Sequence, residues 1–499
     1  MTRSGLGLRA AAGFALLVFQ LGVSAPAWAA CPGDCDGSGQ VTVDELVRGV
    51  SIALGTIALE QCAALDTNGD GAVGVDEIVR AVGIALSACP QDVTPTSTPT
   101  TTPSPSATPS PSADPSASPT ASPLLVTEVT DGLPGSLREV LAGAEAGDTI
   151  AFAVSGAIVL TEGPLVVDID HRTDDGGQSL SLRIVGPGAD LLAVSANQLS
   201  RVLDVRRGRV TIRGLTLRDG RAGGGQDRAG GGIRNAGDLT LEECIVRDHT
   251  LVAQAGCSWD CAGAGIYNQG QLRLTRTWVV GNDAGIGVGG GIASRGGFVE
   301  LVSSTLSDNR ADGGGGGLWL NTALTWLTNS TISGNRSSGT GGGIWALAPL
   351  TLWYTTVADN EAAVGGGIAF PCANAQDCLV AGGSLLTRSI IAANRSGGNC
   401  SMGSFVADPR TGGSVDDDGT CRLDDPTDRS DVPDAGLLPL LAFGVTAAHE
   451  LTADSPALDL GMPPCGSNQT PLATDQRGAP RPVGLGCDSG AIERQANAG

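Results

Sequence analysis

A glycine-rich motif recurs six times between residues 230 and 370 of this 499-residue chain. Each copy reads Gly-Gly-Gly-Ile or a close variant, and the steps between copies are 33, 26, 26, 26 and 24 residues, centred on Ile233, Ile266, Ile292, Leu318, Ile344 and Ile368. A column of Asn or Asp keeps nearly the same step, at Asp248, Asn282, Asn309, Asn335, Asn360 and Asn394. A fixed period of this size indicates a solenoid of stacked repeats.

The residues inside each period indicate which kind of solenoid the repeats form. One aliphatic column lies three residues before the Asn or Asp, at Ile245, Val279, Leu306, Ile332, Val357 and Ile391, and a second at Leu274, Leu301, Leu327, Leu352 and Leu386. Single aliphatic residues between Ser and Thr are typical of strands. We therefore predict a mainly β protein, a parallel β-helix of about eleven coils, with Asn ladders at its corners and Gly where φ is positive.

Composition limits the partners and the compartment. The formal charge is −22, Lys is absent and Arg is scattered, so nucleic acid is not an expected partner. Residues 1–30 combine a basic start, an apolar run and small residues before Cys31, which predicts a secretory signal peptide. No later run is long and apolar enough for a transmembrane helix. The protein is expected to be secreted, extracellular or on the outer cell surface.

All 13 cysteines follow the signal peptide, as expected in an oxidising compartment. Cys257 with Cys261, and Cys372 with Cys378, are close enough in sequence to close local loops. Because the number is odd, one thiol is left free, intermolecular or modified.

Residues 31–90 contain two acidic loops separated by 32 residues, each followed by an amphipathic helix. The first places oxygen-bearing residues at positions 1, 3, 5, 7, 9 and 12 of a calcium loop: Asp34, Asp36, Ser38, Gln40, Thr42 and Glu45. The second places Asp66, Asn68, Asp70, Ala72 and Glu77 at the matching positions, with Ala72 contributing its carbonyl. This array of oxygens with a terminal Glu predicts two calcium ions as cofactors.

The paired loops resemble dockerin-type EF-hand pairs, because the first loop has almost no helix before it. The resemblance implies a small α-helical unit that folds with calcium. It implies a cohesin partner less directly. Dockerins usually place small hydroxyl residues near the end of the loop, where this chain has Val43-Asp44-Glu45 and Val75-Asp76-Glu77.

Residues 91–123 are dominated by Pro, Thr, Ser and Ala and predict a disordered linker. The β-helix is assigned to residues 124–405. A capping box at Ser136-Leu137-Arg138-Glu139 opens a helix that is expected to run through Ala146 and to cover the first coil. Residues 406–499 are assigned to the last coils and a closing segment.

Several motifs of the main domain resemble bacterial surface proteins. The glycine coils are similar to the polymorphic outer membrane protein repeat. Ser455-Pro-Ala-Leu-Asp459, Asp475-Gln-Arg-Gly478 and Cys487-Asp-Ser-Gly-Ala-Ile-Glu493 are similar to the choice-of-anchor Q domain. The resemblance implies a right-handed parallel β-helix on the bacterial surface, with no assigned chemistry.

β-Helices also host polysaccharide lyases and hydrolases. The hydrolase motifs are missing, since Asn321-Thr322 is followed by Ala and no Gly-His-Gly occurs. A calcium-dependent, pectate-lyase-like activity stays open, with an acidic stretch containing Asp416, Asp417, Asp418, Asp424, Asp425 and Asp428 as its candidate cluster. We interpret this stretch as a solvated loop, the histidines as structural, and Asp475, Arg477, Asp488 and Glu493 as ion pairs that close the last coil.

One aromatic pair suggests ligand binding. Trp319 and Trp345 follow the aliphatic residue of two successive glycine motifs. Strand alternation would turn both indoles outward, where a sugar could stack on them. The alternatives are stacked aromatic residues inside a coil and cover for a loop.

The sequence thus predicts a secreted, non-enzymatic surface, adhesion or scaffold protein. It would combine a calcium-binding EF-hand unit with a right-handed parallel β-helix and bind a polysaccharide or another cell-envelope ligand. A polysaccharide lyase is the alternative.

Overall fold

The structure is a computed structural model that describes residues 34–35, 41–53, 57–65, 73, 122–169, 180–223, 228–252, 260–321, 323–370, 384–403, 410–466 and 471–495. The chain divides into two compact units, residues 1–114 and 115–499. The boundary lies within the Pro/Ser/Thr-rich segment. The predicted signal peptide and most of that segment lie outside the described residues.

The described part of the first unit is helical. It contains α1 (Val43–Ala53) and two 3-10 turns, η1 (Leu59–Gln61) and η2 (Ala63–Leu65). A disulfide joins Cys35 to Cys62. Beside it, a small apolar cluster contains Val41, Ile52, Leu65 and Val73.

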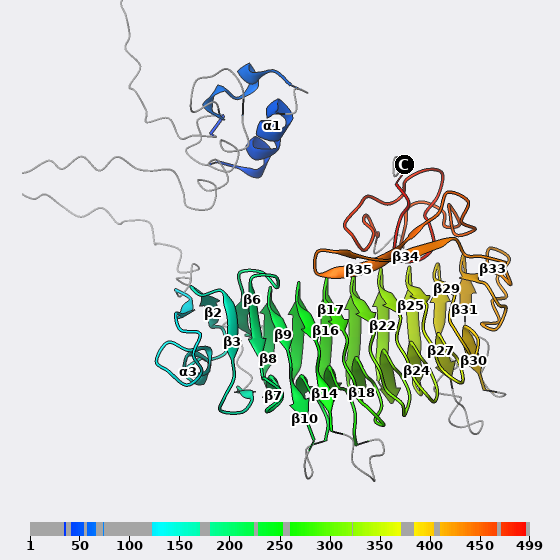
Figure 1. Cartoon of the computed structure of the whole chain (residues 1–499). Helices are drawn as coiled ribbons and strands as arrows, with labels where there is room; N and C mark the ends of the chain where they lie inside the picture. The colour runs from blue at the N-terminus through cyan, green and yellow to red at the C-terminus, as the bar shows by residue number, and fades with distance from the viewer. Residues whose placement is uncertain are drawn as a thin grey trace, which may run out of the picture. The chain divides into compact units, whose positions relative to one another are not determined.

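The second unit is a right-handed parallel β-helix built from three long parallel sheets (Figure 1). Sheet A has eleven strands: β1 (Leu124–Val126), β2 (Thr149–Phe152), β5 (Leu182–Val185), β8 (Arg209–Arg213), β12 (Asp238–Glu242), β16 (Gln271–Thr275), β19 (Phe298–Val302), β22 (Leu324–Thr328), β25 (Leu350–Trp353), β28 (Leu385–Thr387) and β31 (Arg410–Gly412).

Sheet B has nine strands: β4 (Leu165–Asp168), β7 (Leu203–Arg207), β11 (Ile233–Asn235), β15 (Ile266–Asn268), β18 (Ile292–Arg295), β21 (Leu318–Asn321), β24 (Ile344–Ala346), β27 (Ile368–Phe370) and β30 (Cys400–Met402). Sheet C has eleven strands: β3 (Gly156–Val159), β6 (Leu192–Ser195), β9 (Thr216–Arg218), β13 (Ile245–Arg247), β17 (Trp278–Val280), β20 (Thr305–Ser307), β23 (Thr331–Ser333), β26 (Thr356–Ala358), β29 (Ile390–Ala392), β32 (Val415–Asp416) and β33 (Arg429–Ser430).

In the regular part of the β-helix, each coil passes through sheets B, A and C in that order. The eleven strands of sheets A and C match the predicted number of coils. A short extra pair, β10 (Arg221–Ala222) with β14 (Thr250–Leu251), lies between sheets C and B.

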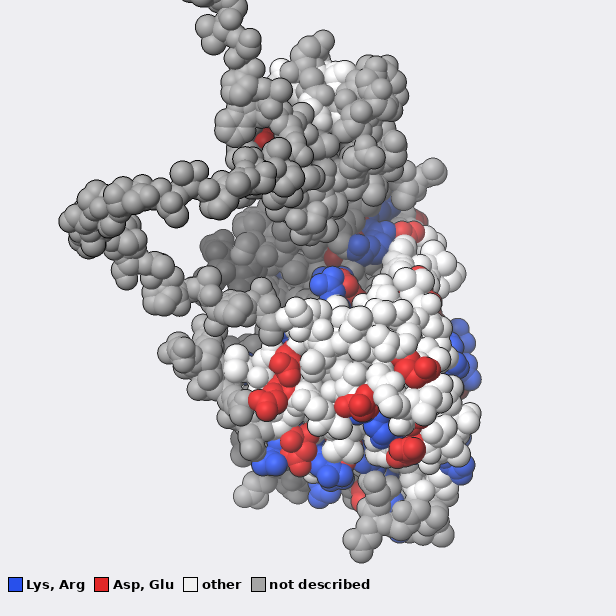
Figure 2. All heavy atoms as spheres, turned by 90° about the vertical axis from the view of Figure 1, so that its left-hand side faces the viewer, with Lys and Arg blue, Asp and Glu red and all other residues white. Residues whose placement is uncertain are grey.

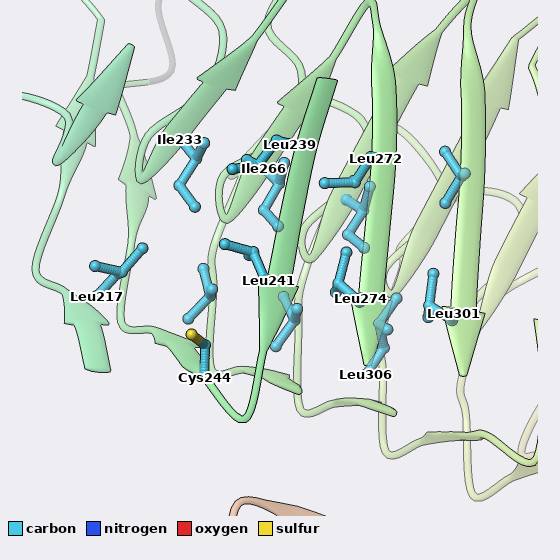
Figure 3. Close-up of a cluster of buried hydrophobic side chains, with 14 of the residues drawn as sticks. Leu217, Ile233, Leu239, Leu241, Cys244, Ile266, Leu272, Leu274, Leu301 and Leu306 are labelled. Carbon is cyan, nitrogen blue, oxygen red and sulfur yellow. The ribbon is translucent and has the colours of Figure 1, made fainter. Parts of the chain in front are cut away.

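The predicted aliphatic columns form the core, because inward residues alternate with outward ones along each strand. The column Leu241, Leu274, Leu301, Leu327, Leu352 and Leu386 is in register and fully buried. Figure 3 shows its first members beside those of sheets B and C. A free cysteine, Cys244, lies among them, and burial raises the pKa of its thiol to about 12. Among the described cysteines it accounts for the expected odd thiol.

The first coil of the Asn column differs from the prediction by one residue. Arg247 pairs with Val280, so His249, not Asp248, occupies the position equivalent to Asn282. Likewise Val246, not Ile245, is the buried aliphatic residue of that coil. The step of 33 residues from Ile233 to Ile266 also separates His249 from Asn282. The prediction followed the residue type, Asp, and so missed this position by one residue.

The glycine motif is required by close backbone packing. In the motif at β21, Gly315 has a φ of +63°. A Cβ atom on the next residue, Gly316, would lie 2.5 Å from the carbonyl oxygens of Arg336 and Gly342. Adjacent coils therefore approach too closely for any other side chain at this position.

A buried ladder of Asn side chains joins the coils at the corner between sheets C and B. The Nδ2 of each member donates to the Oδ1 of the next, at 2.8 to 3.0 Å, in the order Asn282, Asn309, Asn335, Asn360 and Asn394. The same Oδ1 atoms accept backbone N–H groups, as in Asn309 N to Asn335 Oδ1 at 3.1 Å. Polar groups that would otherwise be unsatisfied in the interior are thus paired.

The N-terminal coil is covered by α3 (Leu137–Ala142), as predicted, although the helix ends four residues earlier than expected. Ser136 Oγ accepts a hydrogen bond from Glu139 N, which is one half of the predicted capping box. The other half differs, because the Glu139 carboxylate accepts from Gly135 N and not from Ser136 N. Leu137 and Leu141 are buried against the first coils and close the apolar end of the solenoid.

The C-terminal segment does not continue the stack. An antiparallel hairpin of β34 (Leu437–Phe443) and β35 (Thr446–Leu451) turns back along the outer face of sheet C, and β35 contacts β20 and β23 (Figure 1). We call residues 437–466 and 471–493 the strap. Two disulfides lie in this half of the unit, Cys400–Cys421 in the last coils and Cys465–Cys487 in the strap.

His249 begins the Asn ladder as a neutral side chain. Its backbone N–H donates to Asn282 Oδ1, and its Nδ1 accepts from Gly220 N at 2.8 Å. Nε2 therefore carries the proton and donates to Leu217 O at 3.0 Å. Burial lowers the pKa of His249 to about 3.

Because the pKa of His249 is lower in the folded chain than in the unfolded one, its contribution to stability is complete above the unfolded value near 6.5. That contribution is lost as the pH falls from 6.5 toward 3. In His249→Asn, which restores the residue of the other coils, we expect the pH slope of unfolding free energy to be smaller by up to about 1.4 kcal/mol per pH unit in this window. Urea unfolding of both chains from pH 3 to 8 measures this difference. Identical slopes would contradict a buried neutral imidazole.

Candidate functional site

The first calcium loop is described at its two ends. The carboxylate of Glu45, on the first turn of α1, is 3% exposed and folds back over the loop. Its Oε1 accepts Cys35 N at 2.7 Å, and its Oε2 accepts Thr42 N at 2.7 Å and Thr42 Oγ1 at 2.9 Å. A carboxylate held across both ends of the loop fits the closing ligand of a calcium site.

The remaining predicted ligands are not described. Asp36, Ser38 and Gln40 of the first loop, and Asp66, Asn68, Asp70, Ala72 and Glu77 of the second, lie outside the described residues. Val41 and Val73, at position 8 of the two loops, belong to one buried cluster. Calcium binding remains a prediction with a suitable local framework.

Trp319 and Trp345 are in register on β21 and β24, as expected, but they form no exposed strip. Trp319 is fully buried in a side cluster with Val288 and Ala293, and Trp345 is half-buried. The two rings meet at 63° with centroids 6.4 Å apart, so their faces are not aligned. The indoles do point away from the helix core, but the loops beside sheet B cover them. This is the alternative in which the indoles pack under a loop.

The acidic stretch after β31 ends the Asn ladder. Asn399 accepts from Asn394 Nδ2 at 2.9 Å and donates to Asp416 Oδ1 at 2.7 Å and to Asp417 Oδ1 at 2.6 Å. Asp416 is fully buried rather than solvated, and burial raises its pKa to about 6. Asp428 accepts Ser414 N at 2.7 Å. These carboxylates accept hydrogen bonds from residues of the last coils and do not face a common open site.

The charged residues of the choice-of-anchor-like motifs stabilise the strap from within. Asp475 accepts from Arg477 and from the backbone N–H groups of Ala479 and Glu493. Glu493 lies 3.4 Å from Arg481 with both side chains fully buried, and burial raises the pKa of Glu493 to about 7. These are ion pairs and turn bonds, as expected, but they join residues of the strap to one another and do not close the last coil.

Polar residues of sheet C bind the strap directly. Thr305 Oγ1 donates to Ala447 O at 2.6 Å, and Thr331 Oγ1 donates to Gln476 Oε1 at 2.6 Å. His449 Nδ1 donates to Leu438 O at 2.7 Å, so its Nε2 accepts from Ser333 Oγ at 2.8 Å. His449 is therefore structural, like His249, whereas His171 lies outside the described residues.

Where the strap ends, the outer face of sheet C is open. A groove of about 560 Å³ crosses β3, β6, β9, β13 and β17 there, lined by Gly156, Ala189, Asp190, Ala193, Thr216, Arg218, Ile245, Arg247, Trp278 and Val280. Ile245, which the sequence analysis placed in the core, points into this groove. We refer to it as the sheet C groove.

The groove combines one aromatic ring with charged side chains. Trp278 Nε1 donates to Ser307 Oγ at 2.9 Å, which fixes the indole. Arg218 and Arg247 occupy equivalent positions one coil apart. Arg218 lies 2.9 Å from Asp219, and Arg247 lies 3.4 Å from Asp248. Both Arg side chains are about a third or more exposed. Because exposed ion pairs contribute little, these guanidinium groups can be engaged by a ligand.

Figure 2 shows Arg and acidic side chains interspersed at the end of the β-helix that carries α3. Among the described residues, no group of three or more His, Cys, Asp and Glu is placed to hold a metal ion.

Comparison with known proteins gives a fold likeness only. No family model and no curated protein matches the sequence. Among solved structures, the chain is similar to the crystal structure of pectate lyase Pel9A, with 12% identity and a TM-score of 0.42, over 75% of this chain and 97% of that one. Likeness at this level carries no argument about activity. None of the described helices has the length and apolarity needed to cross a bilayer.

Proposed function

We propose that this protein is a secreted, non-enzymatic surface protein that binds a polysaccharide in the sheet C groove. The observation that carries the proposal is the fixed indole of Trp278 beside Arg218 and Arg247 on a rigid sheet. An indole offers an apolar face to the C–H face of a sugar, while guanidinium groups donate hydrogen bonds to hydroxyl or carboxylate oxygens.

The shape of the groove favours a chain-like ligand. Its lining comes from five successive coils, so it runs along the axis of the β-helix and not around one coil. Equivalent positions recur every 4.8 Å or so along this axis. A polysaccharide lying in the groove would meet repeated side chains at Arg218 and Arg247, which suits a polymer better than a small compact molecule.

The chemistry of the groove favours binding over cleavage. Asp190 is the one carboxylate in its lining, whereas the acidic residues around Asp416 and Glu493 are engaged by protein donors. A lyase would need a calcium site formed by clustered carboxylates next to its base. In the described part of the chain, the groove does not bring such a set together.

We further propose that the first unit binds calcium through Asp34, Glu45 and their partners in the two loops. Calcium would neutralise the clustered carboxylates and fix the loops against α1. This unit would act as a separate module on a linker, with the β-helix displayed at the outer cell surface. A cohesin-like partner is a weaker inference from the same resemblance.

The calcium proposal is tested with Glu45→Gln in the mature chain. Gln keeps the size of the side chain but removes its charge and bidentate coordination. We expect calcium affinity at the first loop to fall by at least about tenfold, measured by isothermal titration with calcium chloride. Glu145→Gln, on the second unit, is the control. Equal calcium affinity in the Glu45 variant and the parent would contradict the assignment of this ligand.

The polysaccharide proposal is tested with Trp278→Ala and with Arg218→Ala/Arg247→Ala. We expect the parent chain to bind one or more soluble polysaccharides of a panel, and both variants to lose about tenfold or more in affinity by affinity electrophoresis. Gln271→Ala, an exposed change on sheet A, should bind like the parent. Retained binding in both groove variants would contradict the site.

The same panel, with calcium added, separates binding from lyase activity. Ultraviolet absorbance of unsaturated uronic ends should stay flat. A rise that a chelator abolishes would establish a lyase in place of a binding protein.

A further inference from the structure

We propose a second ligand surface, on the outer face of sheet A, that takes an uncharged polysaccharide presented as a flat surface. Phe298, Leu324 and Trp326 form it, and we call these three residues the sheet A platform. Leu324 is 56% exposed and Trp326 is 50% exposed. Large apolar side chains grouped at this exposure are typical of binding surfaces.

The register of the sheet assembles the platform. Phe298 of β19 is the direct partner of Leu324 on β22. Trp326 lies two residues beyond Leu324 and therefore projects from the same face. The Phe298 and Trp326 rings meet edge to face at 89°, with centroids 5.3 Å apart. The guanidinium carbon of Arg273 lies 5.6 Å from the Phe298 centroid, so both sides of Phe298 are supported.

The charges next to the platform compensate one another. Arg273 lies 3.1 Å from Asp238 and 3.3 Å from Glu300, and Arg209 lies 3.0 Å from the same Asp238. Glu300 is the strand partner of Trp326. Two arginines and two carboxylates thus form one alternating row on this face. A ligand without net charge is the electrostatic complement of such a row.

A pyranose polymer fits both features. The C–H face of a sugar ring can stack on the exposed indole of Trp326, and its hydroxyl groups can bond to polar residues at the same level. Thr351, the partner of Trp326 on β25, and Thr328 provide hydroxyls on the outward face. The platform lies on the outer face of a long parallel sheet and its apolar side chains are exposed, so a flat or extended partner can reach them. Chains at the surface of an insoluble polysaccharide meet this condition.

This site is separate from the sheet C groove. The platform is on sheet A, whereas Trp278 is on sheet C, and the two sheets meet at a corner of each coil. The proposal therefore does not depend on the proposed function of the groove. A variant of one site leaves the side chains of the other in place.

The test is a depletion assay of the mature chain on microcrystalline cellulose and on chitin, two insoluble uncharged polysaccharides. We expect the parent to be retained on at least one of them, and Trp326→Ala to lose about tenfold or more in affinity. Gln271→Ala, on the same face of sheet A, and Trp278→Ala, in the groove, should bind like the parent. Circular dichroism melting confirms that the exposed substitution leaves the fold intact.

Three results would overturn the proposal. The first is retention of Trp326→Ala equal to that of the parent, and the second is no retention of the parent on either solid. The third is self-association of the parent in sedimentation velocity that Trp326→Ala abolishes, because the platform would then be an interface between two copies of the chain.

Discussion

The buried Asn ladder sets the register of the β-helix, and the rest of the structure depends on that register. A parallel solenoid repeats the same backbone in every coil, so strand pairing alone would allow a coil to slip by one residue. Each ladder amide both donates to and accepts from its neighbours inside the protein. A slip would break these bonds and leave buried amides unsatisfied, at about 1–3 kcal/mol for each group.

Both ends of the ladder are finished by different chemistry. His249 begins it through its backbone N–H and uses its ring to bond the preceding coil. Asn399, Asp416 and Asp417 end it, because carboxylates accept the last amide protons. A column of hydroxyl side chains that includes Ser304 and Ser330 links the coils in the same way at another corner. Each hydroxyl accepts the backbone N–H of the preceding coil. Register is therefore fixed inside the protein, which leaves the outward residues of the sheets free for ligands.

Much of the β-helix could be predicted from the sequence, because the period, the aliphatic columns and the glycine motif each reflect local geometry. The one-residue error at Asp248 arose because the prediction expected Asn or Asp in this column, whereas the 33-residue step of this coil places His249 there. Burial of Trp319 depends on loops that fold over sheet B from other coils. The course of the strap also could not be predicted from the sequence, because its contacts join distant residues: Thr331 donates to Gln476, 145 residues further along the chain.

The exposed aromatic residue was within reach of the sequence. In Leu324-Thr-Trp-Leu-Thr328, Leu327 belongs to a buried column, so alternation places Trp326 outward. The criterion of equivalent aromatic residues in successive coils selects Trp319 and Trp345 and does not select Trp326. The open groove at Trp278 had no such signal, because it depends on where the strap ends.

The register fixed by the ladder turns Trp326 outward on sheet A, whereas the loops beside sheet B cover Trp319. Hydroxyl-radical footprinting with mass spectrometry measures this directly in the mature protein. The structure requires rapid oxidation of Trp326 and protection of Trp319. Equal oxidation of the two, or faster oxidation of Trp319, would contradict this arrangement and with it the assignment of the outer face of sheet A as a ligand surface.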